Sequence, residues 1–190
     1  LAYTTPVGLQ GWRVGANGSL FSYKLIAPEF NMLDATGYSN SMGLEATYPL
    51  QRARLQNLYL GLLYSHRINH NETATGITSH YTINTLGLNL YGNLFDTLGG
   101  GGANSANVSL DHGQLNLNGS PNQAADAASA NTQGSYTKLR YNLSRQQVVT
   151  PELSLLTSLS GQWASKNLDS SEKFYLGGAN GVRAYPSNEG

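Results

Sequence analysis

The sequence contains no cysteine among its 190 residues. A disulfide-stapled scaffold and any site built on thiolate ligands are therefore excluded. Charge is scarce as well: Asp, Glu, Lys and Arg make up 12% of the residues, about half the share of a typical soluble domain. The 11 basic residues balance the 11 acidic ones, so there is no basic excess to attract nucleic acid, and we expect no nucleic-acid partner.

Long apolar runs are also missing. No stretch approaches the roughly 18 consecutive apolar residues that a membrane-spanning helix needs, and the mean hydropathy is −0.33. A membrane-spanning helix is excluded on these grounds. A membrane β-barrel is not excluded, because its strands alternate in hydropathy and average to modest values.

Tyrosine is abundant: twelve Tyr stand against four Phe. Tyr places its ring at a membrane interface and its hydroxyl in water, which favours the aromatic girdles of a barrel. The alternative is that Tyr is simply a good strand residue.

Period-two alternation is the strongest pattern in the chain. Met42, Leu44, Ala46 and Tyr48 share one parity, and polar or small residues hold the other. Each segment of this kind predicts a strand with one apolar and one polar face. The same alternation runs through 58–64, 106–110, 139–143 and 153–163.

The pattern predicts seven strands, over residues 8–24, 38–48, 56–68, 79–94, 104–117, 135–147 and 153–167. The connections alternate in length, and the long ones are expected at 25–37, 69–78 and 118–134. Long loops on one end and shorter turns on the other are typical of outer-membrane barrels, in which the long loops are extracellular. This alternation places the segment after Leu168 at the extracellular end.

In two of these strands the apolar parity shifts by one residue, near Asn17-Gly18 and near Thr85. A shift of facing within one strand would require a β-bulge. A tight hairpin turn at Asn17-Gly18 is the alternative, and we favour one long strand through it.

The polar face carries Arg13, Glu45, Arg67, Lys138 and Arg140. In a barrel these side chains would line a water-filled lumen, and in a soluble β-sandwich they would face solvent. Several strands reach the length of tilted membrane-spanning strands, about ten residues or more. The pattern therefore favours a barrel over a sandwich without excluding the latter.

The most informative stretch is 174–186, which places three glycines, one Arg and several aromatic residues close together. Glycines permit close approach of the backbone, and a confined Arg pairs readily with a carboxylate. This stretch, together with 158–173 before it, resembles the motif segment of two-partner secretion outer-membrane transporters, the haemolysin activator (haemolysin secretion protein) family. In that family the motif loop folds into the barrel lumen, and the matching residues here are Gly177, Gly178, Gly181, Val182, Arg183, Tyr185 and Pro186.

The resemblance implies an all-β fold: a partial antiparallel transmembrane β-barrel of about seven strands, ending in the inward-folding motif loop. We expect residues 1–190 to be a fragment of a C-terminal barrel domain of roughly 16 strands, with periplasmic domains and closing strands outside this chain. The implied function is secretion of a large partner exoprotein of the adhesin or haemolysin type. The implied location is the bacterial outer membrane, in contact with lipid and lipopolysaccharide, and an acidic partner of Arg183 is expected beyond Gly190.

Three other classes stay open. A general porin without a protein client has the same alternation, and an assembly factor that inserts other barrels has a related motif with Gly at position 184, where this chain has Ala. A barrel hydrolase would need a Ser/His/Asp triad, but no nucleophile elbow is present and we expect no enzyme activity. His66 and His70 are four apart without a carboxylate or Cys cluster, so we expect no metal site and no cofactor.

Overall fold

The structure, a computed structural model, describes residues 1–26 and 32–177. Within them a single antiparallel sheet holds eight strands, and each strand pairs with its neighbours in the sequence. The helical elements given bounds here are short: η2 (Leu98–Gly100), α1 (Gln123–Ala128) and η3 (Ser170–Glu172), the last of which follows the final strand. The strands are β1 (Ala2–Val7), β2 (Trp12–Lys24), β3 (Thr36–Arg52), β4 (Gln56–Thr73), β5 (Gly76–Asp96), β6 (Gly102–Asn116), β7 (Gly134–Thr150) and β8 (Leu153–Ala164).

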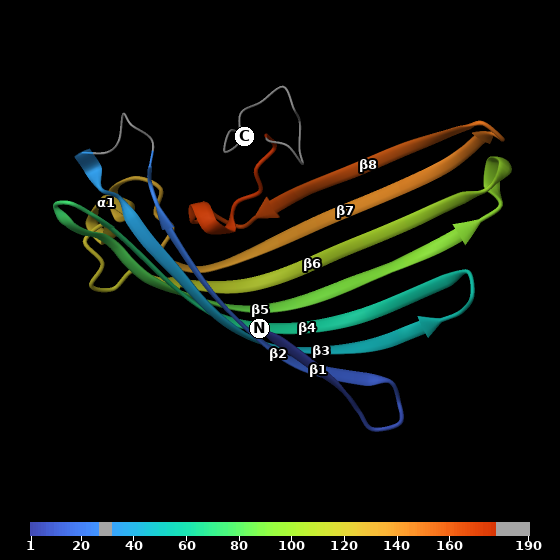
Figure 1. Ribbon diagram of the computed structural model, residues 1–190, viewed down its shortest axis with the longest axis horizontal. Helices are drawn as coiled ribbons and strands as arrows, with labels where there is room; N and C mark the ends of the chain where they lie inside the picture. The colour runs from blue at the N-terminus through green and yellow to red at the C-terminus, as the bar shows by residue number, and fades with distance from the viewer. Residues whose placement is uncertain (27–31, 178–190) are drawn as a thin grey trace.

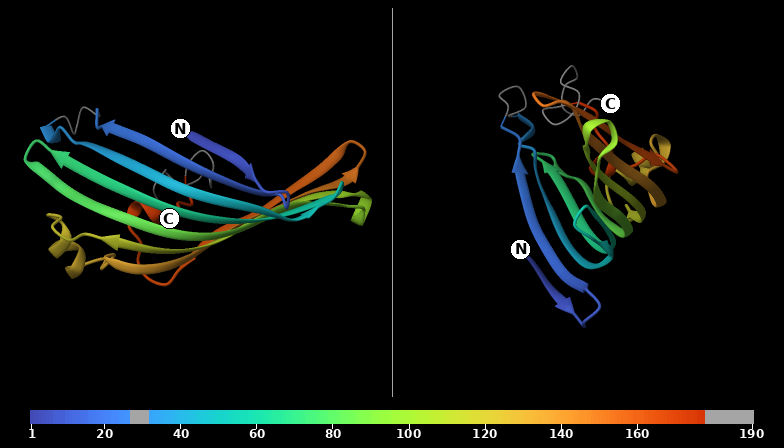
Figure 2. Two further views of the ribbon diagram at one scale, coloured as in Figure 1. Left: turned by 90° about the horizontal axis from the view of Figure 1, so that it is seen from below. Right: turned by 90° about the vertical axis from the view of Figure 1, so that its right-hand side faces the viewer.

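The sheet is strongly curved. Its long strands bend into a trough, which is seen from the side in Figure 1 and from one end in the right-hand view of Figure 2. Antiparallel strands joined by turns twist relative to one another, and the accumulated twist curls a sheet of this size. The curvature gives the sheet a convex face and a concave face.

Over the middle of the sheet, the register assigns the apolar parity of neighbouring strands to the convex face. Leu44, Leu62, Leu88 and Leu110 all lie on it, in neighbouring strands. Leu44, Leu62 and Leu88 are 60%, 43% and 44% exposed, so this face forms a continuous apolar band that no part of the described chain covers. The opposite parity is polar and lies on the concave face, which we call the inner face.

The two ends of the sheet differ. One end, at the left of Figure 1, carries α1 and the β4–β5 turn, and the other carries the β3–β4, β5–β6 and β7–β8 connections. The predicted long loop at 69–78 is wrong, because β4 and β5 continue to a turn of two residues, Ala74 and Thr75. The expected long connection between β6 and β7 is present and contains α1.

The described residues form one strand more than the pattern predicted. Residues 8–11, expected to open the first strand, instead form a turn in which Gly8 and Gly11 have φ of 68° and 89°. β1 precedes this turn and pairs with β2. It escaped prediction because it is short and contains Pro6, which an edge strand tolerates.

Neither parity shift is a bulge. β2 pairs with β3 without interruption from Arg13 to Lys24, and the pairings of β5 around Thr85 are equally regular. The prediction of one long strand through Asn17-Gly18 is confirmed, and the bulge is wrong. Instead, the strands stay regular and their inner face itself becomes apolar and aromatic at one end of the sheet.

No helix in the described ranges is long and apolar enough to cross a membrane.

Candidate functional site

After β8 the chain turns back over the inner face. Residues 165–177, which we call the docked segment, lie in the concavity of the sheet rather than beyond its edge (Figure 1). The segment contains η3, whose first turn is capped by Asp169: its carboxylate accepts hydrogen bonds from the backbone N–H and the hydroxyl of Ser171, at 2.9 and 2.6 Å. This local capping makes a compact unit that can pack as a whole.

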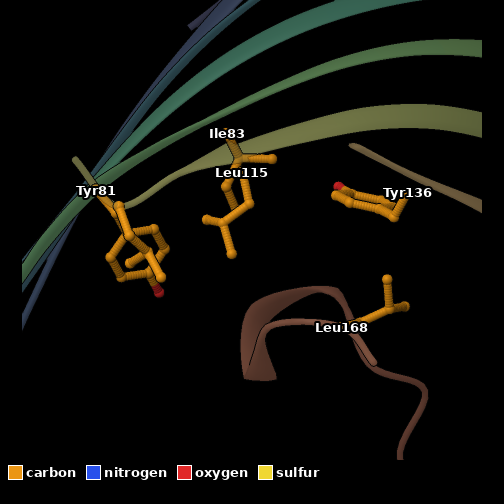
Figure 3. Close-up of a cluster of buried hydrophobic side chains, with 6 residues drawn as sticks. Tyr81, Ile83, Leu115, Tyr136 and Leu168 are labelled. Carbon is orange, nitrogen blue, oxygen red and sulfur yellow. The ribbon is translucent and has the colours of Figure 1, made fainter. Parts of the chain in front are cut away.

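An apolar cluster holds the start of the docked segment. Leu168, which is 5% exposed, packs against inner-face side chains of β5, β6 and β7 (Figure 3). Ile83 and Leu115 are the most deeply buried members, each 2% exposed. The inner face of β5 is apolar here because the segment covers it, which explains the parity shift near Thr85. The full cluster is Tyr81, Ile83, Leu115, Leu117, Tyr136 and Leu168.

Glu172 is the electrostatic centre of the site. It is 4% exposed, and its carboxylate accepts hydrogen bonds from the ammonium of Lys138 and from Nη1 of Arg67, the latter at 2.8 Å. Burial raises the pKa of Glu172, but the hydrogen bond and charge of Lys138 and the charge of Arg67 outweigh it, so the pKa lies below its usual value. A buried carboxylate that stays ionised between two cations ties the segment to β4 and β7.

Two further contacts complete the attachment. Nη2 of Arg140 donates to the backbone carbonyl of Glu172 at 2.8 Å, while its Nε donates to Gln162 on β8 at 2.6 Å. The hydroxyl of Tyr81 donates to Asp169 at 3.1 Å. Side chains from four strands therefore hold Leu168, Asp169 and Glu172 of the segment.

Lys138 is shared between two carboxylates. Its ammonium contacts Glu172 and lies 3.8 Å from Asp111 on β6. If the docked segment leaves, Lys138 keeps a partner on the wall and is not left as an isolated buried charge, which would be costly. Undocking would therefore leave Lys138 beside Asp111.

The segment does not fill the inner face. A hollow of about 510 Å³ lies beside it, lined by Asn107, Ser109, Arg140, Asn142 and Ser160 on the wall and by residues 173–175. The wall of this hollow includes amide and hydroxyl groups, which can exchange hydrogen bonds with water or with another polypeptide.

The predicted inner-face residues separate into two groups. Arg67, Lys138 and Arg140 converge on Glu172. Arg13 and Glu45 share the polar parity but lie on β2 and β3, where Arg13 donates to Thr4 at 3.2 Å. That all five face a water-filled lumen stays a prediction.

Only the first residue of the predicted motif set, Gly177, lies within the described residues. The others, Gly178, Gly181, Val182, Arg183, Tyr185 and Pro186, lie outside them, and their role stays a prediction.

Sequence reasoning did not single out Glu172. The available signal was an acidic residue just before the motif, in a chain whose predicted polar face contains more cations than carboxylates. Without the strand register, nothing in the sequence connects position 172 with positions 67 and 138.

A curved antiparallel sheet of this kind, apolar outside and polar inside with a segment folded back onto the polar face, defines part of a β-barrel wall of the outer-membrane type. The chain belongs to the family described as haemolysin secretion/activation protein ShlB/FhaC/HecB, whose model matches residues 1–189. The suspected family is therefore confirmed, and so is the partial antiparallel barrel.

Curated relatives agree with this assignment. The chain is 25% identical over 186 residues to the heme/hemopexin transporter protein HuxB of Haemophilus influenzae strain Rd, and 26% identical to HuxB of strain 86-028NP. Each match covers 96% of this chain and 32% of the relative. The chain therefore spans about a third of the length of these relatives.

A solved structure shares the fold. CdiB from Escherichia coli superposes with a TM-score of 0.73 at 22% identity, over 92% of this chain and 32% of that one. At this identity the likeness supports the architecture alone.

Proposed function

We propose that this chain forms part of the wall of a larger, closed barrel in a bacterial outer membrane, and that the barrel secretes a large partner exoprotein. Membership of a haemolysin secretion/activation family supports secretion, and the continuous apolar convex face supports contact with lipid and lipopolysaccharide. In the proposed barrel, further strands pair with β1 and β8 and remove the two open edges.

The observation that carries the proposal is the docked segment. A plain pore needs only a polar inner face, whereas here a buried Glu172 and a capped helical turn attach a returning segment to that face. Such an attachment costs conformational entropy, so we infer that the position of this segment matters for the function. We infer that it holds the following motif residues, Arg183 among them, in a fixed position along the export path.

In the proposed mechanism the exoprotein crosses the barrel as an extended chain and folds outside, so that folding favours one direction. The amide and hydroxyl groups beside the docked segment would exchange hydrogen bonds with the passing backbone. No nucleotide and no enzymatic step is part of the proposal.

The test is export by the whole protein with its partner exoprotein. Arg183→Ala is expected to reduce exoprotein in the medium or on the surface while the amount of inserted transporter stays normal. Glu152→Gln, in the β7–β8 turn at the opposite end of the sheet, is the control and should export normally. Unchanged export by Arg183→Ala would remove the role assigned to this residue and favour a general porin.

Two alternatives predict different outcomes in the same cells. If the protein is an assembly factor, its deletion should lower the amounts of many unrelated outer-membrane barrels, whereas a secretion pore should affect one exoprotein. A general porin should change uptake of small solutes and leave every secreted protein at its normal level.

A further inference from the structure

Two histidines far from the docked segment face each other across neighbouring strands. His70 on β4 and His80 on β5 are direct partners in the register, close to the β4–β5 turn. Their parity is that of Leu62 and Leu88, so they lie on the convex face. Their Nδ1 atoms are 3.3 Å apart and share a hydrogen bond, in which the tautomers decide which ring donates. The expectation of no metal site covered all four histidines, His66, His70, His80 and His112, but it rested on the spacing of His66 and His70 and on the lack of a Cys or carboxylate cluster.

The separation of the two nitrogens suits one kind of ligand. Two nitrogens on one tetrahedral zinc ion, with bonds of about 2.0–2.1 Å, lie about 3.3–3.4 Å apart, whereas a right angle at the same bond length would bring them to about 2.9 Å. We propose that His70 and His80 form a binding site for a tetrahedral divalent transition-metal ion, with Zn²⁺ as the best-fitting ion and water in the remaining positions.

Neighbouring side chains hold His70 ready for this role. The ring of Tyr38 stacks on the ring of His70, with centroids 4.9 Å apart and planes inclined by 17°. Oε2 of Glu72 lies 3.6 Å from Nε2 of His70, and Oε1 of Glu72 accepts a hydrogen bond from the Thr36 hydroxyl at 3.1 Å. A carboxylate behind the outer nitrogen favours the tautomer with a proton on Nε2, which leaves the Nδ1 lone pair available to a metal.

The protein supplies two ligands to this proposed metal site. In the described ranges, no group of three or more His, Cys, Asp and Glu side chains is placed to hold a metal. The site therefore has two protein nitrogens and an open coordination sphere. Imidazole ligands suit Zn²⁺ and its neighbours in the transition series, and not Ca²⁺ or Mg²⁺, which take oxygen ligands.

An ion at this position would cross-link two strands that are also tied to the long β6–β7 connection. It would bridge β4 and β5 near their turn, and the backbone N–H of His80 already donates to the hydroxyl of Ser120 at 2.9 Å. Ser120 belongs to the connection that contains α1. Metal binding would therefore stiffen the end of the sheet that carries the long connections, independently of whether the protein exports a client.

The experiment is a zinc titration of the whole protein in detergent after chelator treatment, followed by calorimetry, with cobalt absorption as a second readout. His80→Asn and His70→Asn should each lower zinc affinity at least tenfold relative to wild type and remove the tetrahedral cobalt band. Glu72→Gln should lower affinity by about tenfold, the smaller end of the range for a residue behind a metal-bound histidine.

The matched control is His112→Asn, because His112 contacts only Thr137 in the described hydrogen-bond network, at 3.1 Å, and lies away from the pair. It should bind zinc as wild type does. Comparison with wild type also removes the contribution of histidines elsewhere in the protein. Identical zinc isotherms for wild type, His70→Asn and His80→Asn would overturn the proposal.

Discussion

Replacing Glu172 with Gln should loosen the docked segment by about 2–3 kcal/mol. Hydrogen bonds to charged groups contribute about 1.5–3 kcal/mol each, and removing one partner of a buried ion pair costs about 3–5 kcal/mol. The smaller of these two ranges applies, because Gln retains an oxygen acceptor and Lys138 can turn to Asp111. In addition, the side chain of Arg67 is 33% exposed, so water replaces part of its interaction. The ratio of docked to undocked segment should fall by about 30- to 150-fold.

The assay uses the absence of cysteine from this chain. A single Leu168→Cys substitution introduces a thiol that is buried in the docked state and reacts with a water-soluble maleimide only after undocking. Labelling of Leu168→Cys alone is compared with labelling of the same variant carrying Glu172→Gln or, as a control, Glu152→Gln. The double variant with Glu172→Gln should label about 30- to 150-fold faster. Equal labelling rates for the two double variants would refute the electrostatic account of docking.

The same carboxylate predicts how docking depends on pH. The pKa of Glu172 is lowered in the docked state, so its contribution is fully present above its ordinary value of 4.5 and is lost as the pH falls through the docked pKa. Maleimide reacts with the thiolate, so each labelling rate is divided by the rate for a small free thiol at the same pH. This ratio for Leu168→Cys should be constant between about pH 5 and 8 and rise below about pH 4. A rise that persists unchanged in the Glu172→Gln variant would contradict this assignment.

Two further predictions concern the wall itself, measured by urea unfolding of the whole protein. Gly113→Ala should destabilise by about 1–3 kcal/mol, because a Cβ there would collide with the ring of Tyr136, whereas Gly18→Ala, which meets only the carbonyl of Ser41 at 3.6 Å, should be nearly neutral. Ile83→Ala should cost about 2–5 kcal/mol by leaving a cavity under the docked segment. Leu86→Ala on the convex face should cost less, because Leu86 is 60% exposed and its truncation leaves no enclosed cavity. Equal losses of unfolding free energy for the two glycine variants, or for Ile83→Ala and Leu86→Ala, would contradict the packing described for that pair.

The face of each side chain could be predicted from the sequence, because alternation in a strand depends only on the two-residue repeat of the backbone. The strands containing Leu44, Leu62, Leu88 and Leu110 all have the predicted apolar parity. The family could be recognised from 158–186, because those residues are close together in the chain and need no knowledge of the fold.

The ends of the strands could not be predicted equally well. The turn at Ala74 and Thr75 is flanked by polar residues of β4 and β5, which looked like a loop because neither face there is apolar. The polar extension is stable because the two strands pair with each other, and hydrogen bonding between backbones does not require an apolar side chain. The β1 strand was missed for the related reason that its neighbour supplies the pairing.

The sequence by itself determined the class of the protein: the alternation specified an apolar and a polar face, the lack of long apolar runs excluded a membrane-spanning helix, and the motif identified the family. Only the tertiary structure decided which distant residues meet. Glu172 lies 34 residues from Lys138 and 105 from Arg67, and His70 meets His80 only through the register of one hairpin. Curvature and register bring such side chains together, and both depend on the pairing of all the strands rather than on any local run of residues.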